Sequence, residues 1–293
     1  MTRHPEISRA EALLDALPFI QRFRGQTFVI KYGGSAMEDE HLVERTLCDV
    51  VFLEAVGIRP VIVHGGGKAI TDRMREAGIK AHFVNGLRVT DAASMQIVAD
   101  TLENVINPMI VSKLGEFGGK AVGVSGRETV RARKAPPQPG GKKGQAADLG
   151  FVGEVESVTL DAVRAALGRG LIPVVSPVGV DAVGTALNIN ADVAAGAVAA
   201  DLQAAKLIYI SDVRGIMRDP SQADSLIPSV NREMIGKLVK DGIIEGGMIP
   251  KVESAAEALG KGVGKVHLID GRLAHALLLE LFTDSGVGTE IAP

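Results

Sequence analysis

The sequence predicts an α/β fold with a mostly parallel sheet covered by helices on both faces. Short apolar runs alternate with segments of helical periodicity along most of the chain. Two of the apolar runs, 28–30 and 60–63, lead through paired glycines into a helix. Because the carboxyl ends of parallel strands meet at one edge of a sheet, we expect both glycine turns to face the same crevice.

Composition narrows the class of protein. The 293 residues are 46% hydrophobic with a net charge of −3, enough for one large or two modest domains. The near-neutral charge and only 3% aromatic residues give no reason to expect nucleic acid or an anionic membrane as partner. The single cysteine, Cys48, excludes an intrachain disulfide and is expected to be a buried structural thiol. Without a signal peptide or a membrane-spanning apolar run, a cytoplasmic protein is expected.

The first half of the chain opens with an amphipathic segment at 7–24, which predicts a helix kinked or broken at Pro18. Its apolar face packs either on its own domain or on another subunit, and periodicity does not separate these alternatives. A strand at 28–31 and a helix over 37–51 follow, and then a second strand at 60–64 with its glycine turn.

Between residues 85 and 176 the sequence predicts a tight turn followed by further helices and strands. Asn85-Gly86 marks a tight turn, and Thr90 or Asp91 is suited to cap a following helix. Arg88 lies between them, and an arginine can hold a carboxylate with two parallel hydrogen bonds. We expect a helix at 92–107, a parallel strand at 119–125, a mobile surface loop at 131–147, an edge strand or hairpin arm at 151–158, a helix at 161–169 and a buried strand at 171–176.

A second half begins near 178–184 and again alternates strands with helices. A glycine turn at 246–247 leads into a helix that carries Lys251 in its first turn. The other expected elements are helices at 193–200, 229–241 and 274–282, strands at 206–211 and 263–270, and a final edge strand at 286–291.

The polar residues at these strand ends and glycine turns suit phosphoryl transfer, which needs positioning and charge neutralisation more than covalent chemistry. The sequence has no His/Cys metal cluster, no nucleophile elbow and no P-loop, and its triple glycine after His64 is a poor dinucleotide fingerprint. His64 could be a base, although a lone histidine there more often makes structural hydrogen bonds. The candidate site residues are Lys31, Gly33, Gly34, Gly65, Gly66, Arg88, Asn188, Asn190, Asp192, Asp212 and Lys251.

Six motifs occur in one order along the chain and together resemble the amino-acid kinase family, in particular its members that phosphorylate N-acetyl-L-glutamate in arginine biosynthesis. They are Lys31-Tyr-Gly-Gly-Ser, His64-Gly-Gly-Gly, Asn85-Gly-Leu-Arg-Val-Thr-Asp, Asn188-Ile-Asn-Ala-Asp, Ser211-Asp-Val-Arg-Gly and Gly246-Gly-Met-Ile-Pro-Lys. The resemblance implies a three-layer αβα sandwich with an open sheet. It also implies an N-terminal oligomerisation helix at 1–25, a lobe at 26–180 that binds N-acetylglutamate and makes the dimer contact, and an ATP-binding lobe at 181–293.

The resemblance also implies roles for single residues. Lys31 and Lys251 match the family's transition-state lysines, and Asp192 matches the aspartate that orients them. Substrate contacts are implied for Gly65, Gly66, Arg88, Asn188 and, as an alternative to Asn188, Asn190. Phosphate contacts are implied for Gly33 and Gly34, and nucleotide contacts for Asp212, Gly215, Met217, Ile243 and Glu245. Mg²⁺ would be coordinated by the phosphates of ATP, without a metal site on the protein.

The segments Glu11-Ala-Leu-Leu-Asp-Ala-Leu-Pro-Phe-Ile and Val266-His-Leu-Ile-Asp-Gly resemble the arginine-inhibited branch of this family. That branch implies a homohexamer built as a trimer of dimers, with arginine bound between the N-terminal helix and the C-terminal half. His267, Glu280 and Gly288 are the candidate contacts. The family usually has a shorter segment in place of 131–147. Two alternatives stay open, a kinase of the same fold acting on another small acid and a non-catalytic sensor of arginine or nucleotide.

Overall fold

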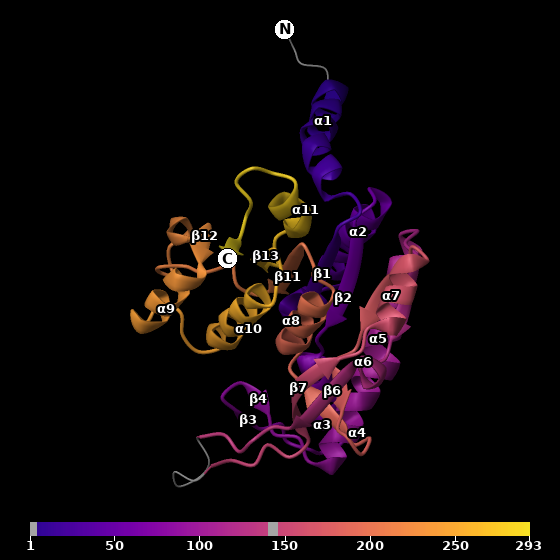
Figure 1. Cartoon of the computed structure of the whole chain (residues 1–293), viewed down its shortest axis with the longest axis vertical. Helices are drawn as coiled ribbons and strands as arrows, with labels where there is room; N and C mark the ends of the chain where they lie inside the picture. The colour runs from indigo at the N-terminus through magenta and orange to yellow at the C-terminus, as the bar shows by residue number, and fades with distance from the viewer. Residues whose placement is uncertain (1–4, 140–145) are drawn as a thin grey trace.

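The computed structural model of the chain describes residues 5–139 and 146–293, and within them eight strands form one continuous sheet (Figure 1). The strand order is β12-β14-β13-β11-β1-β2-β8-β5, and every neighbouring pair is parallel except β13 with β14. The mostly parallel sheet of the prediction is therefore confirmed. The bounds are β1 Thr27–Tyr32, β2 Arg59–His64, β5 Ala121–Val124, β8 Ile172–Val175, β11 Lys206–Ser211, β12 Ser229–Asn231, β13 Lys265–Asp270 and β14 Thr289–Ala292.

Helices cover both faces of this sheet, because successive side chains of a buried strand point to opposite sides. In β1, Phe28 and Ile30 belong to one core and Val29 to the other. The first core packs against α1 (Pro5–Phe23), α2 (Glu40–Ala55), α3 (Gly67–Glu76), α4 (Ala92–Asp100), α5 (Asn107–Glu116) and α11 (Ala276–Leu281). The second packs against α7 (Asp161–Gly168), α8 (Ala191–Asp201), α9 (Arg232–Lys240) and α10 (Met248–Gly260). A single turn of helix, α6 (Gly126–Thr129), follows β5.

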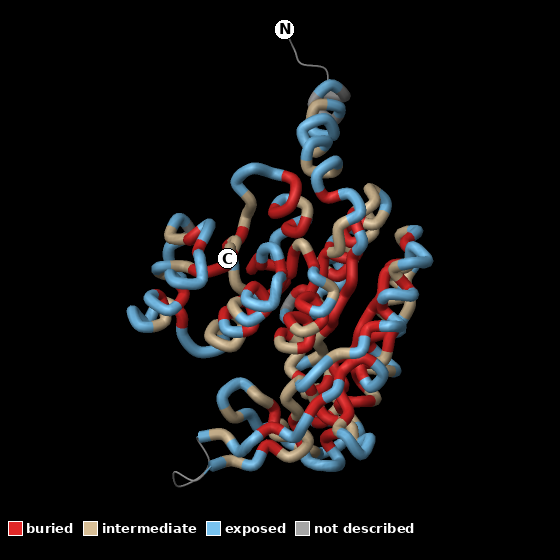
Figure 2. The backbone as a smooth tube through the Cα atoms, viewed as in Figure 1, coloured by how far each residue is buried: buried red, intermediate tan, exposed pale blue. Residues whose placement is uncertain are grey.

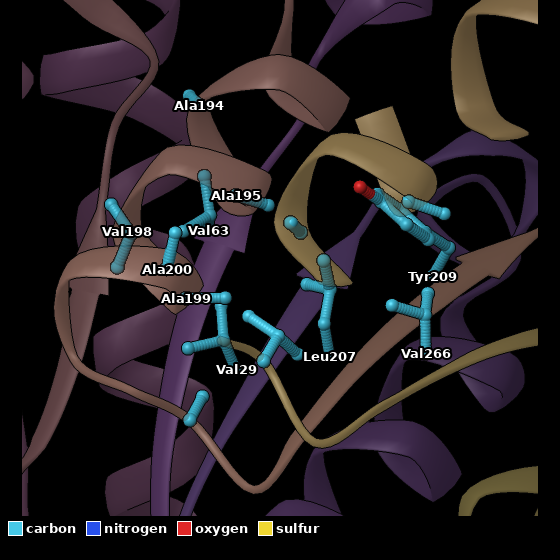
Figure 3. Close-up of a cluster of buried hydrophobic side chains, with 14 of the residues drawn as sticks. Val29, Val63, Ala194, Ala195, Val198, Ala199, Ala200, Leu207, Tyr209 and Val266 are labelled. Atoms are coloured by element: carbon cyan, nitrogen blue, oxygen red, sulfur yellow. The ribbon is translucent and has the colours of Figure 1, made fainter. Parts of the chain in front are cut away.

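The second core depends on the small side chains of α8. Ala194, Ala195 and Ala199 are fully buried, and they lie over the strands that carry Val29 and Val63 (Figure 3). Alanine lets the helix axis approach the sheet closely while keeping high helix propensity. As a result, the first turn of α8 lies beside the carboxyl end of β1.

Four further strands close into a small barrel beside the main sheet, and a separate hairpin lies near it. The barrel order is β10-β7-β6-β9, and the hairpin pairs β3 with β4. Their bounds are β3 Phe83–Val84, β4 Leu87–Arg88, β6 Val130–Lys134, β7 Val152–Val158, β9 Val178–Val180 and β10 Ala186–Ile189. The expectation of a loop at 131–147 is wrong at its start, because β6 pairs with β7. Gln138 and Ala147 also pair with each other, and 140–145 lie outside the described residues.

Three other expectations differ from the structure. Cys48 is exposed rather than buried, because it lies on the outward side of α2 between buried neighbours. The final strand is not at the edge, since β14 lies between β13 and β12, and the short β12 takes the edge. Pro18 does not break α1. The carbonyl that loses its helical partner there belongs to Leu14, which is 65% exposed, so water can replace the bond.

The helix expected over 92–107 is longer and irregular. α4 passes into a π-helical segment, Thr101–Ile106, and then directly into α5. The N-terminal helix α1 projects from the molecule, and much of its surface is exposed (Figures 1 and 2). No helix among the described residues is long and apolar enough to cross a membrane. The division of the chain at residues 25 and 180 stays a prediction.

Candidate active site

Lys31 owes its position to β1. It shares a strand face with Val29, so its side chain points toward the layer of α8 and α10. Its neighbours across the strands are Val63 of β2 and Tyr209 of β11. The lysine side chain is only 9% exposed. A charged group this deeply buried needs an oppositely charged or hydrogen-bonding partner.

Asp192 is that partner, and it contacts a second lysine as well. Its two carboxylate oxygens lie 3.0 Å from Lys31 Nζ and 2.6 Å from Lys251 Nζ. Asp192 stands in the first turn of α8, and Lys251 in the first turn of α10. The cap of α8 is Asn190, whose side-chain oxygen accepts the Asp192 N–H at 2.8 Å. Because Asn190 caps the helix, the carboxylate of Asp192 is not needed as a cap and bridges the two lysines.

Burial and charge act in opposite directions on this cluster. Burial lowers the pKa of Lys31 by more than the nearby Asp192 charge raises it. Burial by itself raises the pKa of Asp192. The charges of Lys31 and Lys251 more than offset this effect and hold the pKa of the carboxyl below its usual range. Asp192 is therefore ionised at neutral pH. With both lysines protonated, the cluster carries one net positive charge, which suits an anionic ligand.

The two glycine turns meet beside this cluster, as expected from the parallel sheet. A Cβ on Gly33 would lie 3.7 Å from the Gly65 Cα and 2.7 Å from Lys31 Nζ. A side chain at Gly33 would therefore displace the lysine. Gly66 is equally restricted, because a Cβ there would lie 2.5 Å from Ile106 Cδ1. Gly34 has a φ of +73°, in the left-handed region that favours glycine.

A cavity of about 620 Å³ opens between the glycine turns and the lysine–aspartate cluster. It brings together most of the residues expected to bind substrate: Lys31, Gly34, Gly65, Gly66, Arg88, Asn188, Asn190 and Asp192 all line it. Gly33 is not among its lining residues. A pocket of this size, with convergent polar groups and buried titratable residues, is a good candidate for a small-molecule site.

Arg88 lies in this cavity at the end of the β3–β4 hairpin, and α3 holds its guanidinium. Its Nη2 donates to the Gly67 carbonyl and to Thr71 Oγ1, both at 2.8 Å. The guanidinium also lies over the ring of Phe83, 4.7 Å from the centroid. Burial lowers the pKa of Arg88, but from so high a value that it keeps its charge. Because these partners are neutral, the positive charge stays available to a carboxylate.

The two asparagines of the site differ in how their side chains are used. Asn190 is occupied as the cap of α8. Asn188 lies at the end of β10, and its Nδ2 donates to Thr90 Oγ1 at 3.1 Å. Its carbonyl oxygen and second amide hydrogen are left for other partners. This supports the preference for Asn188 as the substrate contact.

Of the predicted nucleotide residues, Asp212, Gly215 and Met217 follow the carboxyl end of β11, whereas Ile243 and Glu245 lie in the connection between α9 and α10. The charge of Asp212, next after β11, is close enough to raise the pKa of Lys31. Met217 pairs with Leu226, and Gly215, with φ +137°, closely approaches Thr289. Neither these three residues nor Ile243 and Glu245 line the cavity described above. Their role in nucleotide binding stays a prediction.

A second, larger cavity of about 1530 Å³ shares Asp192 with the first and adds Lys251, Gly246 and Gly247. It extends along α8 and α10 on one side and along β7 on the other. Because the lysine–aspartate cluster lies where the two cavities meet, a ligand in each cavity could present its reacting group to that cluster.

His64 is not a base in this structure. It is fully buried, and burial lowers its pKa to about 4. Its Nε2 lies 3.3 Å from Asn107 Nδ2 and its Nδ1 lies 2.9 Å from the Gly65 carbonyl. The ring is thus neutral at physiological pH and supports the glycine turn, which agrees with the structural alternative.

The candidate effector residues also meet, at the opposite end of the sheet. His267 Nδ1 lies 2.7 Å from Glu280 Oε1, and the other Glu280 oxygen accepts the Val287 and Gly288 N–H groups at 2.7 and 2.9 Å. Sequence reasoning missed Lys206, whose Nζ lies 2.7 Å from His267 Nε2. Burial lowers the pKa of Lys206 to about 8. The sequence does hold a signal for this residue, because Lys206 is a charged residue at the start of the buried strand β11.

The N-terminal helix reaches this candidate effector cluster through its last turn. Lys206 Nζ lies 5.3 Å from the ring centroid of Phe23, and Phe282, just after α11, packs edge-on against Phe19, Phe23 and Phe52. Aromatic packing of this kind ties α1 to α11.

Comparison with known proteins identifies the family. The sequence pattern described as "Amino acid kinase family" matches residues 26–270, most of the chain. The chain belongs to the amino acid kinase family. Curated relatives within it include the acetylglutamate kinase of Akkermansia muciniphila, 50% identical over 97% of this chain and 96% of the relative, and that of Desulfitobacterium hafniense, 47% identical over the same shares.

Solved structures with the same fold include members with other activities. N-acetylglutamate synthase from Neisseria gonorrhoeae, complexed with coenzyme A and N-acetyl-glutamate, is 27% identical with a TM-score of 0.83. The match covers 97% of this chain but only 63% of the synthase. Carbamate kinase from Giardia, 17% identical with a TM-score of 0.65, shows the fold alone; the match covers 92% of this chain and 99% of that chain. The αβα sandwich predicted from the six motifs is thus confirmed.

Proposed function

We propose that this amino acid kinase transfers the γ-phosphoryl group of ATP to the γ-carboxylate of N-acetyl-L-glutamate, giving ADP and N-acetyl-L-glutamyl 5-phosphate for arginine biosynthesis. The observation that carries the proposal is the carboxylate of Asp192 bridging Lys31 and Lys251 beside two glycine turns. Curated relatives that match nearly the whole chain at about half identity are named acetylglutamate kinase, which supports the choice of substrate.

The proposed reaction does not need a general base. A glutamate γ-carboxyl group in water has a pKa of about 4.3, so it is ionised at neutral pH and is already the nucleophile. The obstacle is repulsion between this anion and the phosphoryl group. Lys31 and Lys251 reach the reacting centre from β1 and α10 and offset that repulsion, while Asp192 holds both ammonium groups in place.

The substrate is held at both of its ends. We assign the α-carboxylate to Arg88 and Asn188, and the γ-carboxylate and transferring phosphoryl group to the N–H groups of the glycine turns. The neutral surroundings of Arg88 leave its charge for a substrate carboxylate. A side chain at Gly33 would displace Lys31, and one at Gly66 would press on Leu102 and Ile106. Glycine at both positions therefore keeps the backbone N–H groups of the turns free to approach a phosphoryl oxygen.

ATP, as the second substrate, is assigned to the second half of the chain, with Asp212, Gly215, Met217, Ile243 and Glu245 along it. Among the described residues, no group of three or more His, Cys, Asp or Glu could hold a metal ion. A magnesium ion would therefore be held mainly by the phosphates and water, as Mg²⁺ commonly is. It would supply charge neutralisation there, and no step of the transfer is assigned to it.

Arginine is the proposed inhibitor, and the Lys206–His267–Glu280 cluster with Gly288 is its proposed site. The cluster is buried at the junction of α1 and the C-terminal half. A further solved structure supports arginine as a ligand, because N-acetylglutamate synthase from Neisseria gonorrhoeae complexed with coenzyme A and L-arginine matches 97% of this chain and 65% of that one at 26% identity with a TM-score of 0.79.

A homohexamer, a trimer of dimers joined through α1, is the proposed assembly. Ile7, Leu13, Leu14 and Leu17 leave an apolar surface on the projecting helix, with Leu13 69% exposed. Deleting residues 1–25, or introducing Leu13→Asp with Leu14→Asp, should leave a dimer with a weakened arginine response. Light scattering of each variant tests this, and a variant that stays hexameric and fully inhibited would contradict it.

The decisive measurement is ADP release with ATP and Mg²⁺ on N-acetyl-L-glutamate, L-glutamate and L-aspartate, with and without arginine. We expect turnover on the acetylated substrate alone, suppressed by arginine. Turnover on another acid would favour the second candidate, a kinase of the same fold with a different substrate. Absence of turnover on all three acids would favour a sensor.

A further inference from the structure

The second glycine turn offers the cavity a backbone donor that the fold itself does not use. The Gly65 N–H is occupied, because it donates to the Tyr32 carbonyl of β1 at 2.7 Å. The next N–H, that of Gly66, has no hydrogen-bond partner in the part of the chain that the structure describes, and Gly66 lines the cavity of about 620 Å³. This N–H is therefore left for water or for a ligand in that cavity.

The side chain of His64 sets the direction of the Gly66 N–H. Its Nδ1 lies 2.9 Å from the carbonyl oxygen of Gly65, which belongs to the same peptide unit as the Gly66 N–H. The C=O and N–H of a trans peptide point in opposite directions, and the described residues contain no cis peptide. Because the carbonyl is held at the histidine ring, the N–H points away from that ring.

This direction leads to the reacting centre. His64 shares a face of β2 with Ile62, which packs in the core beneath α2 to α5, whereas Lys31 of β1 points to the opposite face of the sheet. The Gly66 N–H, turned away from His64, therefore points to the side on which Lys31 and Asp192 meet. The proposed function places the transferring phosphoryl group on that side.

Asn107, the first residue of α5, decides which ring nitrogen of His64 carries the proton. Its Nδ2 donates to the Val174 carbonyl of β8 at 2.8 Å, and because a carbonyl only accepts hydrogen bonds, this contact fixes the orientation of the amide. The same Nδ2 lies 3.3 Å from His64 Nε2, which therefore accepts and carries no proton. Burial lowers the pKa of His64 to about 4, so at neutral pH the ring has a single proton, on Nδ1, facing the Gly65 carbonyl.

The interior of the protein protects this series of hydrogen bonds from water. The His64 ring is fully buried, and Asn107 is 6% exposed. Gly123 of β5 leaves space for the amide, because a side chain there would collide with Asn107 Oδ1. The series thus runs from a backbone carbonyl of the central sheet to the Gly65 carbonyl, and each of its members has only one donor–acceptor arrangement available.

We propose that His64 is a positioning residue for the phosphoryl transfer: by holding the Gly65 carbonyl it aims the Gly66 N–H at the transferring phosphoryl group, and Asn107 keeps the ring in the tautomer that this requires. The inference rests on the proposed function. A donor that is fixed beforehand stabilises the charge of the transition state without reorganisation. Loss of an interaction that is made mainly in the transition state lowers kcat and leaves KM nearly unchanged.

Three substitutions of His64 separate positioning from packing. In asparagine the amide nitrogen is bonded to Cγ, as Nδ1 is in histidine, so His64→Asn keeps a donor for the Gly65 carbonyl. In His64→Gln the nitrogen is one bond further out, and His64→Leu has no donor. We expect the glutamine and leucine variants to lower kcat about 100-fold, the loss typical of one preorganised donor, and the asparagine variant to stay within about tenfold of wild type. KM for N-acetyl-L-glutamate and for ATP should change less than about threefold in all three variants.

A role in packing alone predicts a different order. Asparagine is the smallest of the three replacements and leaves the largest void, so His64→Asn would then be the least stable and the least active variant. Thermal unfolding and kcat are therefore measured on each protein. The same three substitutions at His41, whose side chain is 85% exposed, are the matched controls and should leave both quantities close to wild type. Equal kcat for His64→Asn and His64→Gln, or a kcat that follows Tm across the series, would overturn the proposal.

The tautomer of His64 is a second prediction, and it requires no turnover. Nitrogen-15 NMR distinguishes protonated from unprotonated ring nitrogens, and any folded His64 variant identifies the signals of this ring among the six histidines. At neutral pH we expect the proton on Nδ1 alone, and a proton on Nε2 of the wild-type protein would overturn the proposal. Asn107→Asp replaces the donor with an acceptor and should bring a proton to Nε2. An Nε2 that stays unprotonated in that variant would contradict the role of Asn107, and the wild-type spectrum decides if the variant does not fold.

The outcomes separate the two proposals. A wild-type protein without turnover on N-acetyl-L-glutamate would overturn the proposed function, whatever the tautomer of His64. An active wild type whose His64→Asn and His64→Gln variants have equal kcat would overturn the positioning role of His64 alone.

Discussion

Two buried lysines on neighbouring strands show how differently one sheet can use the same residue type. Lys31 lies near the carboxyl end of β1, and Lys206 opens β11 beside Phe28. The register separates them by three residues, or about 10 Å along the strands. Since Lys31 shares the face of Val29 and Lys206 that of Ile208, they also point to opposite faces.

Their partners differ as much as their positions. Lys31 faces the ionised Asp192, which a second lysine also binds. Lys206 faces His267, whose other nitrogen is paired with Glu280. Burial lowers the pKa of both lysines, and that of Lys206 reaches about 8. A carboxylate in direct contact counters the effect of burial on the pKa of Lys31, whereas the carboxylates Glu280 and Glu290 do so only in part for Lys206.

Removing a lysine from the Lys31–Asp192–Lys251 cluster should have the largest effect on activity. Lys31→Ala and Lys251→Ala should each lower kcat about 100- to 1,000-fold, the usual loss for one preorganised donor at a developing charge. ADP release under saturating substrates measures this. Lys265→Ala, which breaks a surface pair with Glu290, is the control. A loss smaller than about tenfold at Lys31 would show that the two lysines do not share the transition-state charge.

Asp192→Asn breaks the same cluster from its centre. Without the carboxylate, two ammonium groups lie close together with no counter-charge, which costs about 3 kcal/mol or more in the free energy of unfolding. Urea unfolding at pH 7 gives the change. Asp181→Asn, at an exposed turn, should have a smaller effect. Equal losses for the two variants would mean that the lysines find other partners.

A third buried carboxylate sharpens the comparison. Asp49 lies 2.6 Å from the half-exposed His275, and burial raises the pKa of Asp49 to about 6. A raised pKa means that the stability from this group is present below about pH 4 and is lost as pH rises through about 6. Asp49→Asn should therefore gain on the order of 1–3 kcal/mol relative to wild type between pH 4 and pH 7. Urea unfolding at both pH values tests this, and a difference independent of pH would contradict it.

The smallest effect is expected at the effector cluster. Lys206→Ala should weaken inhibition by arginine about tenfold, the loss typical of one charged hydrogen bond, and should lower kcat far less than Lys31→Ala does. Inhibition curves on both proteins measure the shift. A Lys206→Ala protein inhibited like wild type would place arginine elsewhere.

Sequence reasoning located the strand-end residues well, because a strand, a glycine pair and a helix are local patterns. The meeting of Lys31, Asp192 and Lys251 depended on matching the order of motifs, since no local signal relates residues so far apart. Lys206 was missed because its partners come from β13 and α11.

The irregular parts were harder to predict. The winding of Thr101–Ile106 depends on Pro108 and on anchors in α3, α6 and β8, none of which is visible in helical periodicity. The exposure of Cys48 depends on the rotation of α2, and apolar neighbours in sequence did not fix that rotation. Helical periodicity over 229–241 hides β12, which is only three residues long, and without β12 the sequence predicts an edge position for the final strand.

The central pairing of β1 with β11 has a consequence for the synthesis of the protein. Phe28 is paired with Lys206, so β1 leaves the ribosome long before its neighbour exists. At usual rates of translation, the intervening stretch takes roughly 10–35 s to make. During that time the apolar β1, paired only with β2, is an open edge that other nascent chains can join. The pairing of β1 with β11, which joins the two halves of the enzyme, therefore forms late in synthesis, and until then β1 is exposed to pairing with the wrong strand.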